Sequence, residues 1–300
     1  MDQDNLILTD ADWFAADLDR YCETYNLKLY SIHDLVINFQ VDTWPHLLMV
    51  AGPALEQGPA AVGLGQRDFE LFKATVEKMN NGWFEPSEIN IASNDRNVSV
   101  NWHAGNCADF TPPRLSGYNL AEIKAAAKVY RELLKTVAEP SASAVLLDLP
   151  GGEDYFRHEI SCNYPLLVDS LLAGKDEKFV TSCRAITGMG RGFSPTGDDL
   201  IHGALIAFNY FSYDHNFAEK ITGGLAETAA LTNAMGGHML DTGIRGLTPV
   251  NVQAFITSIA ANKPDYLTLD RLLKIGSNTG YDLAAALLCY IFRMTESRSD

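Results

Sequence analysis

Residues 188–211 read GMGRGFSPTGDDLIHGALIAFNYF, a glycine-rich loop that runs directly into an apolar helical pattern. The loop glycines allow positive φ and close approach by another group, and Pro195 stiffens the turn. Asp198 stands where the helix N-cap is expected, because the apolar pattern begins just after the two aspartates. The stretch therefore predicts a tight loop, a helix capped by Asp198 and a freer carboxylate at Asp199.

A glycine loop at a helix N-terminus is a common anion-binding arrangement, because it combines unpaired N–H groups with the positive end of the helix dipole. This loop has neither the Gly-Lys-Ser/Thr of a P-loop nor the spacing of a dinucleotide-binding fingerprint. Two adjacent aspartates repel each other and any anion. We therefore expect Arg191 or a bound Mg²⁺ to supply positive charge. The alternative is a purely structural loop before a capped helix.

A second stretch repeats the pattern of this loop. Residues 277–283 read Ser-Asn-Thr-Gly-Tyr-Asp-Leu and residues 194–200 read Ser-Pro-Thr-Gly-Asp-Asp-Leu, each ahead of an apolar helix. We expect the two helix N-termini to face one another across one site, each supplying backbone N–H groups, a hydroxyl and a carboxylate. The alternative is that Ser-x-Thr-Gly-x-Asp is a common capping composition and the likeness a coincidence.

The two stretches contain the candidate site residues. The expected catalytic residues are Asp199, Asp282 and Arg191, and the two aspartates are also the expected metal ligands. Mg²⁺ is the one cofactor that the sequence suggests. The expected ligand-binding residues are the loop residues Gly188, Gly190, Gly192, Ser194, Thr196, Gly197 and Asp198 in the first stretch, and Gly276, Ser277, Asn278, Thr279 and Gly280 in the second.

Other polar motifs are less specific. His202 follows Asp199 by three residues on one helix face, so it is either half of a metal-binding Asp-x-x-His or a histidine of the core. Gly236-Gly237-His238 interrupts a helical pattern and indicates either a loop close to the site or a helix break. No Ser-His-Asp order, Cys-His pairing or zinc-ligand spacing is present.

The pattern along the chain predicts an α+β protein with two domains. Residues 1–115 contain short β-rich runs separated by Pro and Gly, preceded by a helix after Thr9 or Asp10 and with another helix over 68–79. Residues 116–300 are almost entirely helical in periodicity and carry both glycine loops. We expect a β-rich N-terminal domain with a leading helix and an α-helical C-terminal domain.

Composition excludes several classes of function. The chain has 300 residues with 23 Lys and Arg against 38 Asp and Glu, a net charge of −15 that repels nucleic acid and anionic membranes. The N-terminus has no signal-peptide pattern, and the apolar runs are too short or interrupted to span a bilayer. Five scattered cysteines without a C-x-x-C fit reduced thiols. These features predict a cytoplasmic protein with a small-molecule substrate.

The motif of residues 188–199 resembles the signature Gly-x-Gly-x-Gly-[Leu/Phe]-[Thr/Ser]-Pro-[Ser/Thr]-Gly-Asp-Asp of a bacterial family long described as a domain of unknown function. That family includes the H subunit of oxamate carbamoyltransferase, from anaerobic allantoin breakdown. Residues 275–282 resemble its second motif, and Asn38, Pro59 and Gly63 fit its N-terminal strands. Met189, Arg191 and Phe193-Ser194 stand where the family most often has Leu, Pro and Leu-Thr. The predicted helix before residue 27 is additional to the family's pattern.

The resemblance implies a subunit of a hetero-complex with large partners similar to acyl-CoA synthetases. It also implies carbamoyl transfer between oxalurate and phosphate, giving oxamate and carbamoyl phosphate, all of which are small anions. Two helix N-termini would suit such ligands and would stabilise negative charge on the carbamoyl oxygen. Two alternatives remain open: a non-catalytic metabolite-binding or assembly subunit, and a Mg²⁺-dependent phosphotransferase that uses Asp199 and Asp282.

Overall fold

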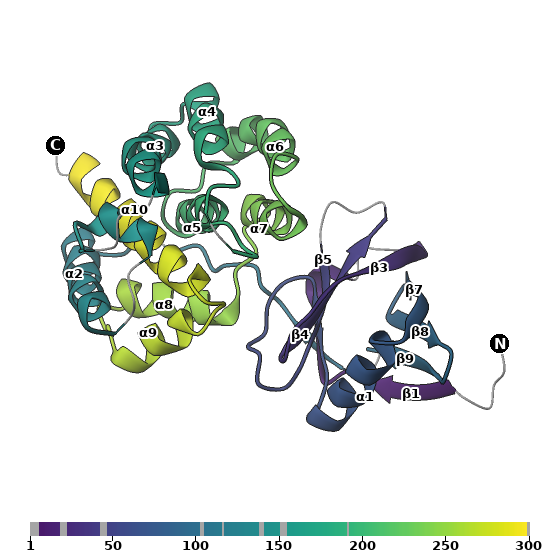
Figure 1. The fold of residues 1–300 in the computed structure, drawn as a ribbon. Helices are drawn as coiled ribbons and strands as arrows, with labels where there is room; N and C mark the ends of the chain where they lie inside the picture. The colour runs from purple at the N-terminus through teal and green to yellow at the C-terminus, as the bar shows by residue number, and fades with distance from the viewer. Residues whose placement is uncertain are drawn as a thin grey trace. The chain divides into compact units, whose positions relative to one another are not determined.

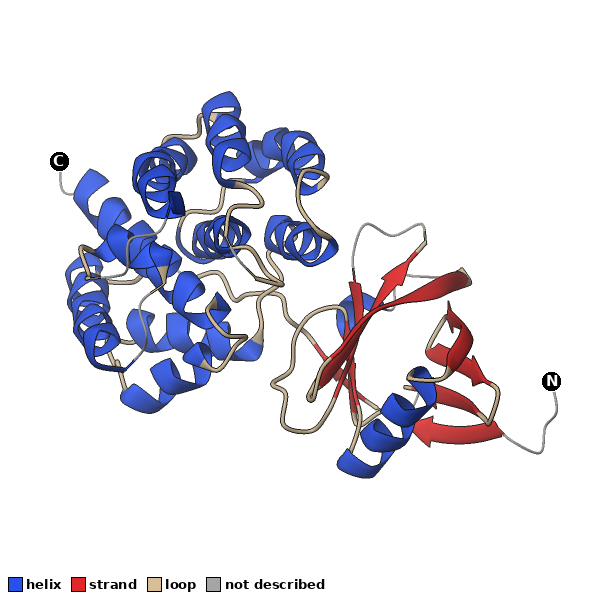
Figure 2. Cartoon of the chain, in the orientation of Figure 1, coloured by secondary structure: helices blue, strands red, loops and turns tan. Residues whose placement is uncertain are grey.

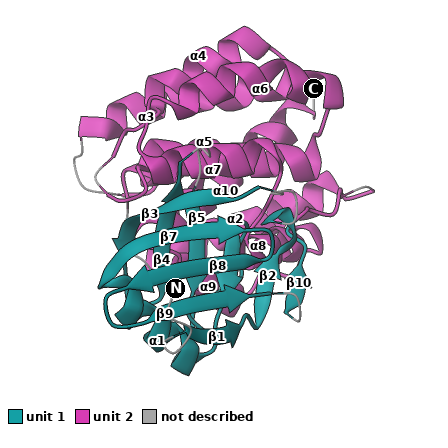
Figure 3. Cartoon of the chain, turned by 90° about the vertical axis from the view of Figure 1, so that its right-hand side faces the viewer, with its two compact units in different colours: residues 1–110 teal, residues 111–300 magenta. Residues whose placement is uncertain are grey.

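The computed structural model describes residues 6–18, 23–42, 47–102, 105–115, 117–137, 141–150, 155–190 and 192–298. The chain divides into two compact units, residues 1–110 and 111–300, which are coloured separately in Figure 3. Strands form the first unit and helices fill the second (Figure 2). The α+β class with a β-rich N-terminal part is thus confirmed.

The first unit is built on a ten-stranded sheet with the strand order β1-β9-β8-β7-β3-β4-β5-β6-β2-β10. Most neighbouring strands are antiparallel, whereas β1–β9, β5–β6 and β2–β10 are parallel pairs. The strands are β1 Leu6–Asp10, β2 Trp13–Ala15, β3 Tyr25–Ile32, β4 Val36–Val41, β5 Leu47–Ala51, β6 Ala61–Gly63, β7 Met79–Glu85, β8 Glu88–Ser93, β9 Asn97–Asn101 and β10 Asn106–Ala108.

One helix, α1 (Gln66–Val76), belongs to this unit and occupies the region where the sequence predicts a helix. Its buried side chains include Phe69, Phe72 and Val76, spaced three and four residues apart as on one helix face. The ring of Phe72 meets Phe39 of β4 edge to face, with centroids 6.1 Å apart. Apolar burial on one helix stripe therefore attaches α1 to the sheet.

The predicted leading helix is wrong. Residues Leu6–Asp10 form β1, paired with β9, and Trp13–Ala15 form β2; only Ala16–Leu18 makes a single 3-10 turn. Tyr21, which the helical spacing included, lies outside the described residues. Phe14 and Leu18 are buried as expected. A few apolar positions fit both a helical and an extended period, and here pairing with distant strands decides between them.

The second unit is a bundle of nine helices among the described residues (Figure 1). They are α2 Leu120–Val137, α3 Tyr155–Leu172, α4 Asp176–Ile186, α5 Thr196–Phe211, α6 His215–Ala229, α7 Ala234–Ile244, α8 Val250–Ala260, α9 Tyr266–Leu273 and α10 Thr279–Ser297, with a 3-10 helix, η3, at Ala142–Leu147. Across the described residues, we find no helix long and apolar enough to cross a membrane.

Helices α5 and α10 form the centre of the bundle. Every residue of α5 is buried, and α10 is buried along most of its length. A helix that is apolar on all sides must be enclosed by others, and α5 lies among α3, α4, α7 and α10 (Figure 1). Both central helices begin at the end of a glycine loop, so the two predicted motifs open the two most buried helices of the unit.

Candidate functional site

Helix α5 begins at Thr196, two residues earlier than the sequence predicts. Pro195 is its N-cap, and the Pro195 carbonyl accepts hydrogen bonds from the N–H groups of Asp198 and Asp199 at 3.0 and 3.1 Å. Asp198 therefore lies inside the first turn, and its predicted role as N-cap is wrong. The proline ring holds φ at −64°, and a ψ of 136° gives Pro195 the extended backbone of an N-cap residue.

The Asp198 carboxyl instead connects the glycine loop to α7. It accepts hydrogen bonds from the backbone N–H of Gly188 at 2.9 Å and from the Thr232 hydroxyl. A Cβ at Gly236 would lie 2.1 Å from Asp198 Oδ2, so only glycine fits there. Burial raises the pKa of Asp198, and these two hydrogen bonds oppose the rise.

Helix α7 corrects one interpretation of the Gly236-Gly237-His238 motif. The helix starts at Ala234, and the side chain of its N-cap Asn233 accepts the Gly236 N–H at 2.9 Å. The glycines therefore lie within a helix and do not mark a break. The predicted loop is wrong for the same reason, although the motif does lie beside Asp198, to which Gly236 gives room.

The two glycine loops share one backbone design. In the first, the Ile186 carbonyl accepts the N–H of Met189 at 3.1 Å, and the Met189 carbonyl accepts the N–H of Gly197 at 2.8 Å. A Cβ at Gly197 would lie 1.8 Å from the Ile186 oxygen, which requires glycine. These hydrogen bonds join the end of α4 to the first turn of α5 and close the loop between them.

The second loop repeats these contacts. The Leu272 carbonyl accepts the N–H of Ile275 at 3.1 Å, and the Ile275 carbonyl accepts the N–H of Gly280 at 2.9 Å. A Cβ at Gly280 would lie 2.0 Å from the Leu272 oxygen. The units α4–loop–α5 and α9–loop–α10 are therefore local structural repeats, so the likeness between the two motifs extends beyond capping composition.

Equivalent positions of the two repeats meet. A Cβ at Gly203 of α5 would lie 2.6 Å from the Cβ of Ala286 of α10, and each residue stands seven positions after the threonine of its own motif. Contact between matching positions is expected when two copies face one another around an approximate two-fold axis. The first turns also approach each other as predicted, because Asp282 and Thr279 act on Asp199 and Thr196 acts on Asp282.

The carboxyl groups of Asp199 and Asp282 lie at this meeting point. Asp199 is 1% exposed and Asp282 is fully buried. The Ser194 hydroxyl donates to Asp199 Oδ1, and the hydroxyls of Ser141 and Ser143 both donate to Asp282 Oδ1. The Oδ2 atom of each carboxyl is buried and has no hydrogen-bond partner among the described residues.

Burial and proximity raise the pKa of both acids. Burial is the main cause of the pKa of Asp199 lying well above its usual range, and the charge of Asp282 adds to it. Burial raises the pKa of Asp282 to about 6, although the serine hydroxyls oppose the rise. The threonine hydroxyls act on the aspartate of the opposite motif through hydrogen bonds: Thr279 lowers the pKa of Asp199, and Thr196 lowers that of Asp282. Such a pair retains a proton or takes a cation.

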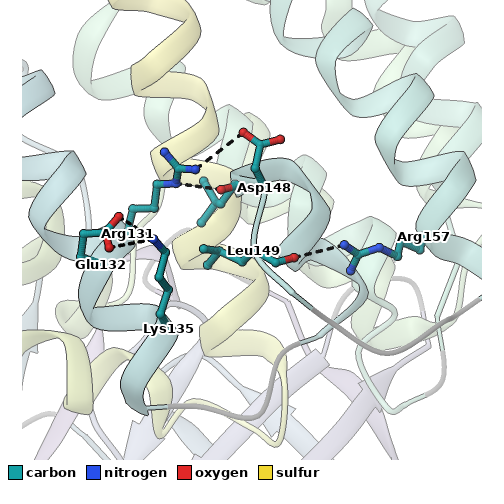
Figure 4. Close-up of polar contacts among 7 residues, drawn as sticks. Arg131, Glu132, Lys135, Asp148, Leu149 and Arg157 are labelled. Atoms are coloured by element: carbon teal, nitrogen blue, oxygen red, sulfur yellow. Dashed lines mark hydrogen bonds and ion pairs between the residues drawn. The ribbon is translucent and has the colours of Figure 1, made fainter.

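The serines next to Asp282 come from η3, which the sequence analysis did not associate with the site. Two arginines hold this segment (Figure 4). Arg131 Nε of α2 donates to the Leu147 carbonyl at 2.8 Å, and Arg157 Nη2 of α3 donates to the Leu149 carbonyl at 3.1 Å. Burial and the charge of Asp282 raise the pKa of the neighbouring Tyr281 to about 12, and the positive charge of Arg157 opposes the rise. No local pattern in the sequence marks these serines, since the fold brings them in from 139 and 141 residues away.

The remaining predicted site residues divide into exposed, half-buried and buried groups. The buried ones are Gly197, Gly280 and Thr196, and the exposed ones are Gly188, Gly192, Gly276, Ser277 and Asn278. Gly190, Ser194 and Thr279 are half-buried. The N–H groups of Gly188, Gly197 and Gly280 are already paired within the chain, so they do not contribute to anion binding. Arg191 lies outside the described residues. Anion binding by the rest of the loops stays a prediction.

His202 of α5 is buried and packs against α7, where a Cβ at Gly243 would lie 2.9 Å from its ring. Burial lowers the pKa of its imidazole to about 4, so the ring is neutral at pH 7. In the part of the chain that the structure describes, no group of three or more His, Cys, Asp or Glu side chains is placed to hold a metal ion. Its burial and neutral ring agree with the interpretation of His202 as a core residue, and a metal-binding role with Asp199 stays a prediction.

Comparisons with known proteins identify one family. Neither the curated proteins nor the solved structures contain a match to the chain. One family model matches residues 186–291, which begin at the last residue of α4 and end within α10, so both glycine loops lie inside the matched segment. The model describes oxamate carbamoyltransferase subunit AllH, which confirms the predicted resemblance over this segment.

Proposed function

We propose that this chain is a subunit of a carbamoyltransferase-type enzyme that acts between oxalurate and phosphate, with oxamate and carbamoyl phosphate as products. The observation that carries the proposal is that the two loop–helix repeats, with equivalent residues of α5 and α10 in contact, lie inside the segment that matches the AllH family. The family description names a subunit, so we also expect partner subunits.

The expected ligand site lies at the exposed parts of both loops, above the Asp199–Asp282 pair. In the transfer, a phosphate oxygen attacks the ureido carbon of oxalurate, the carbon–nitrogen bond breaks, and the departing oxamate nitrogen takes up a proton. Negative charge grows on the carbamoyl oxygen before that bond breaks. The helix N-termini of α5 and α10 favour negative charge there, and Arg191 is the proposed positive side chain.

The test measures the reaction in the reverse direction, as phosphate released from carbamoyl phosphate in the presence of oxamate. The purified chain is assayed alone and with its partner subunits. We expect oxamate-dependent release only in the complex, and isothermal titration of the chain alone should detect binding of oxamate or carbamoyl phosphate.

Asn278→Ala is the matched loop variant, because Asn278 is exposed and its side chain makes no cap hydrogen bond. We expect it to weaken ligand binding without changing stability. Asn80→Ala, also an exposed asparagine, is the control and should leave binding unchanged. Ligand binding without any effect of the chain on turnover by the partners would favour a non-catalytic binding subunit. Turnover by the chain alone with Mg²⁺ would favour a phosphotransferase.

A further inference from the structure

Within each carboxyl group of the Asp199–Asp282 pair, the two oxygen atoms differ in their hydrogen bonds. In both carboxyl groups Oδ1 accepts hydroxyl hydrogen bonds, from Ser194 in one case and from Ser141 and Ser143 in the other. In both, Oδ2 is buried without a partner in the described part of the chain. A carboxylate held through one oxygen by hydrogen bonds, with the other oxygen left over, is the usual arrangement of a metal ligand.

We propose that Asp199 and Asp282 together bind one hard divalent cation, Mg²⁺, through their Oδ2 atoms, with the hydroxyls of Thr196 and Thr279 beside it. This inference rests on the site of the proposed function, and it adds the means by which that site accepts an anion. A cation between two carboxylates and an anionic substrate removes the repulsion that the bare pair would exert.

Electrostatics support a cation at this place. Asp199 and Asp282 are 1% and 0% exposed, and burying an unpaired carboxylate costs several kcal/mol unless a partner compensates it. The groups that act most strongly on their pKa values are other carboxyls and hydroxyls. Arg157 donates through Nη2 to the Leu149 carbonyl, and its Nη1 is buried without a partner in the described part of the chain. Neither aspartate has an arginine or lysine among the groups that act on its pKa. Positive charge from a bound ion would balance the two acids.

The donor set identifies the class of ion. The groups that hydrogen-bond to the two aspartates or act on their pKa values are carboxyls and hydroxyls. Such oxygen atoms suit Mg²⁺ better than softer metals that prefer nitrogen or sulfur. Mg²⁺ is commonly held by only one or two carboxylates, and water and substrate oxygens complete its octahedron. A site with two acids therefore agrees with the absence, among the described residues, of any cluster of three or more His, Cys, Asp or Glu.

The duplication accounts for the detailed likeness of the two motifs. Each copy supplies one aspartate at the fourth helical position and one threonine at the first. Crosswise action of the threonines on the opposite aspartates places all four groups around one point. One ion on an approximate two-fold axis would use the same residues from both copies, which a pair of independent caps would not require.

The competing occupant is a single proton shared by the two acids, as in other close carboxyl pairs. The experiment uses the full chain without substrate or partner subunits. Mn²⁺ binding is counted by electron paramagnetic resonance at pH 7.5, and Mg²⁺ is titrated in as competitor. We expect one Mn²⁺ per chain, displaced by Mg²⁺, and a rise in melting temperature on adding Mg²⁺.

Three variants test the residues. Asp282→Asn should weaken Mn²⁺ binding at least 100-fold, and Ser143→Ala, which removes a hydrogen bond to the ligand, should weaken it about 10-fold. Asp148→Asn is the matched control: its side chain is 92% exposed beside the same 3-10 helix, and asparagine tolerates its φ of 54°. We expect no change for the control.

Two results would overturn the proposal. Wild-type chain that binds no Mn²⁺ while remaining folded by circular dichroism would assign the pair to a shared proton. Equal Mn²⁺ binding by wild type and Asp282→Asn would place the ion elsewhere. Neither outcome bears on carbamoyl transfer itself: transfer activity that persists in excess EDTA would keep the proposed function and remove the cation from it.

Discussion

The two loop–helix repeats have the same backbone but different surroundings. Gly197 and Gly280 occupy matching positions against the carbonyls of Ile186 and Leu272. The first loop is three residues longer, and its helix carries Asp198 where the second carries Tyr281. Asp198 ties the first loop to α7, whereas Tyr281 lies near Arg157 of α3. The same loop backbone therefore places Asp199 and Asp282 at equivalent positions of two helices whose neighbouring side chains differ.

The largest expected effect comes from the shared glycines. Gly197→Ala forces a Cβ to within 1.8 Å of the Ile186 carbonyl oxygen, and Gly280→Ala does the same at Leu272, 2.0 Å away. Because backbone atoms must move, we expect each change to lower the free energy of unfolding by about 2–4 kcal/mol. Urea denaturation measures it.

Gly223→Ala is the control for these glycines, since it lies in α6 and its added Cβ would meet nothing within 4 Å. Alanine there should stabilise the chain slightly, because its helix propensity is higher than that of glycine. If only one of Gly197→Ala and Gly280→Ala destabilises, the two loops are not equivalent.

The second prediction concerns the pH dependence of the acid pair in the presence of EDTA. The pKa of Asp282 is raised to about 6 in the folded chain, so the folded state holds its proton more tightly than the unfolded state. Its contribution to stability is therefore present below about pH 4 and is lost as the pH rises to about 6. Asp199, whose pKa is also raised, extends the loss to higher pH.

His202 titrates in the same window with the opposite sign, because its pKa is lowered to about 4 and the unfolded state binds the proton more tightly. The measurement is therefore the difference between Asp282→Asn and wild type at pH 4.5 and pH 7.5. Relative to wild type, the variant should gain about 2–3 kcal/mol between these values. A difference that does not change with pH would show that Asp282 has an ordinary pKa.

The third prediction compares Asp198 with its counterpart Tyr281. Asp198→Ala leaves the Gly188 N–H and the Thr232 hydroxyl without their acceptor, so we expect a loss of about 1–3 kcal/mol. Tyr281→Phe removes only a hydroxyl and should cost less. Thr232→Val should reproduce part of the Asp198→Ala loss, whereas Thr136→Val, an exposed threonine on α2, should be neutral. Thermal melts of the four variants decide this order.

The smallest expected effect on stability concerns the N-caps of α4 and α9, the helices that precede the two loops. Asp265 caps α9, and its side chain accepts the Thr268 N–H at 2.9 Å, whereas the α4 N-cap, Lys175, makes no such bond. Asp265→Ala should cost about 1 kcal/mol and Lys175→Ala less than about 0.5 kcal/mol. Equal losses in chemical denaturation would mean that capping contributes the same to both repeats.

Sequence patterns predicted much of the fold and the centre of the site. The helix over 68–79, the β-rich character of the first part and the helical character of the second all follow from local patterns, and the structure contains them. Two predictions were wrong. The leading helix failed because β1 pairs with β9, which is distant in sequence, and the capping role of Asp198 failed because α5 already begins after Pro195.

The sequence by itself determined that two Ser-x-Thr-Gly-x-Asp loops open two apolar helices, since glycine positions and apolar periods are local properties of the chain. Tertiary structure alone decided that Asp199 and Asp282 are buried where the two motifs meet and that Ser141 and Ser143 hold one of them. The physical reason is that burial and these hydrogen bonds come from packing between segments 83 to 141 residues apart, and no local pattern encodes them.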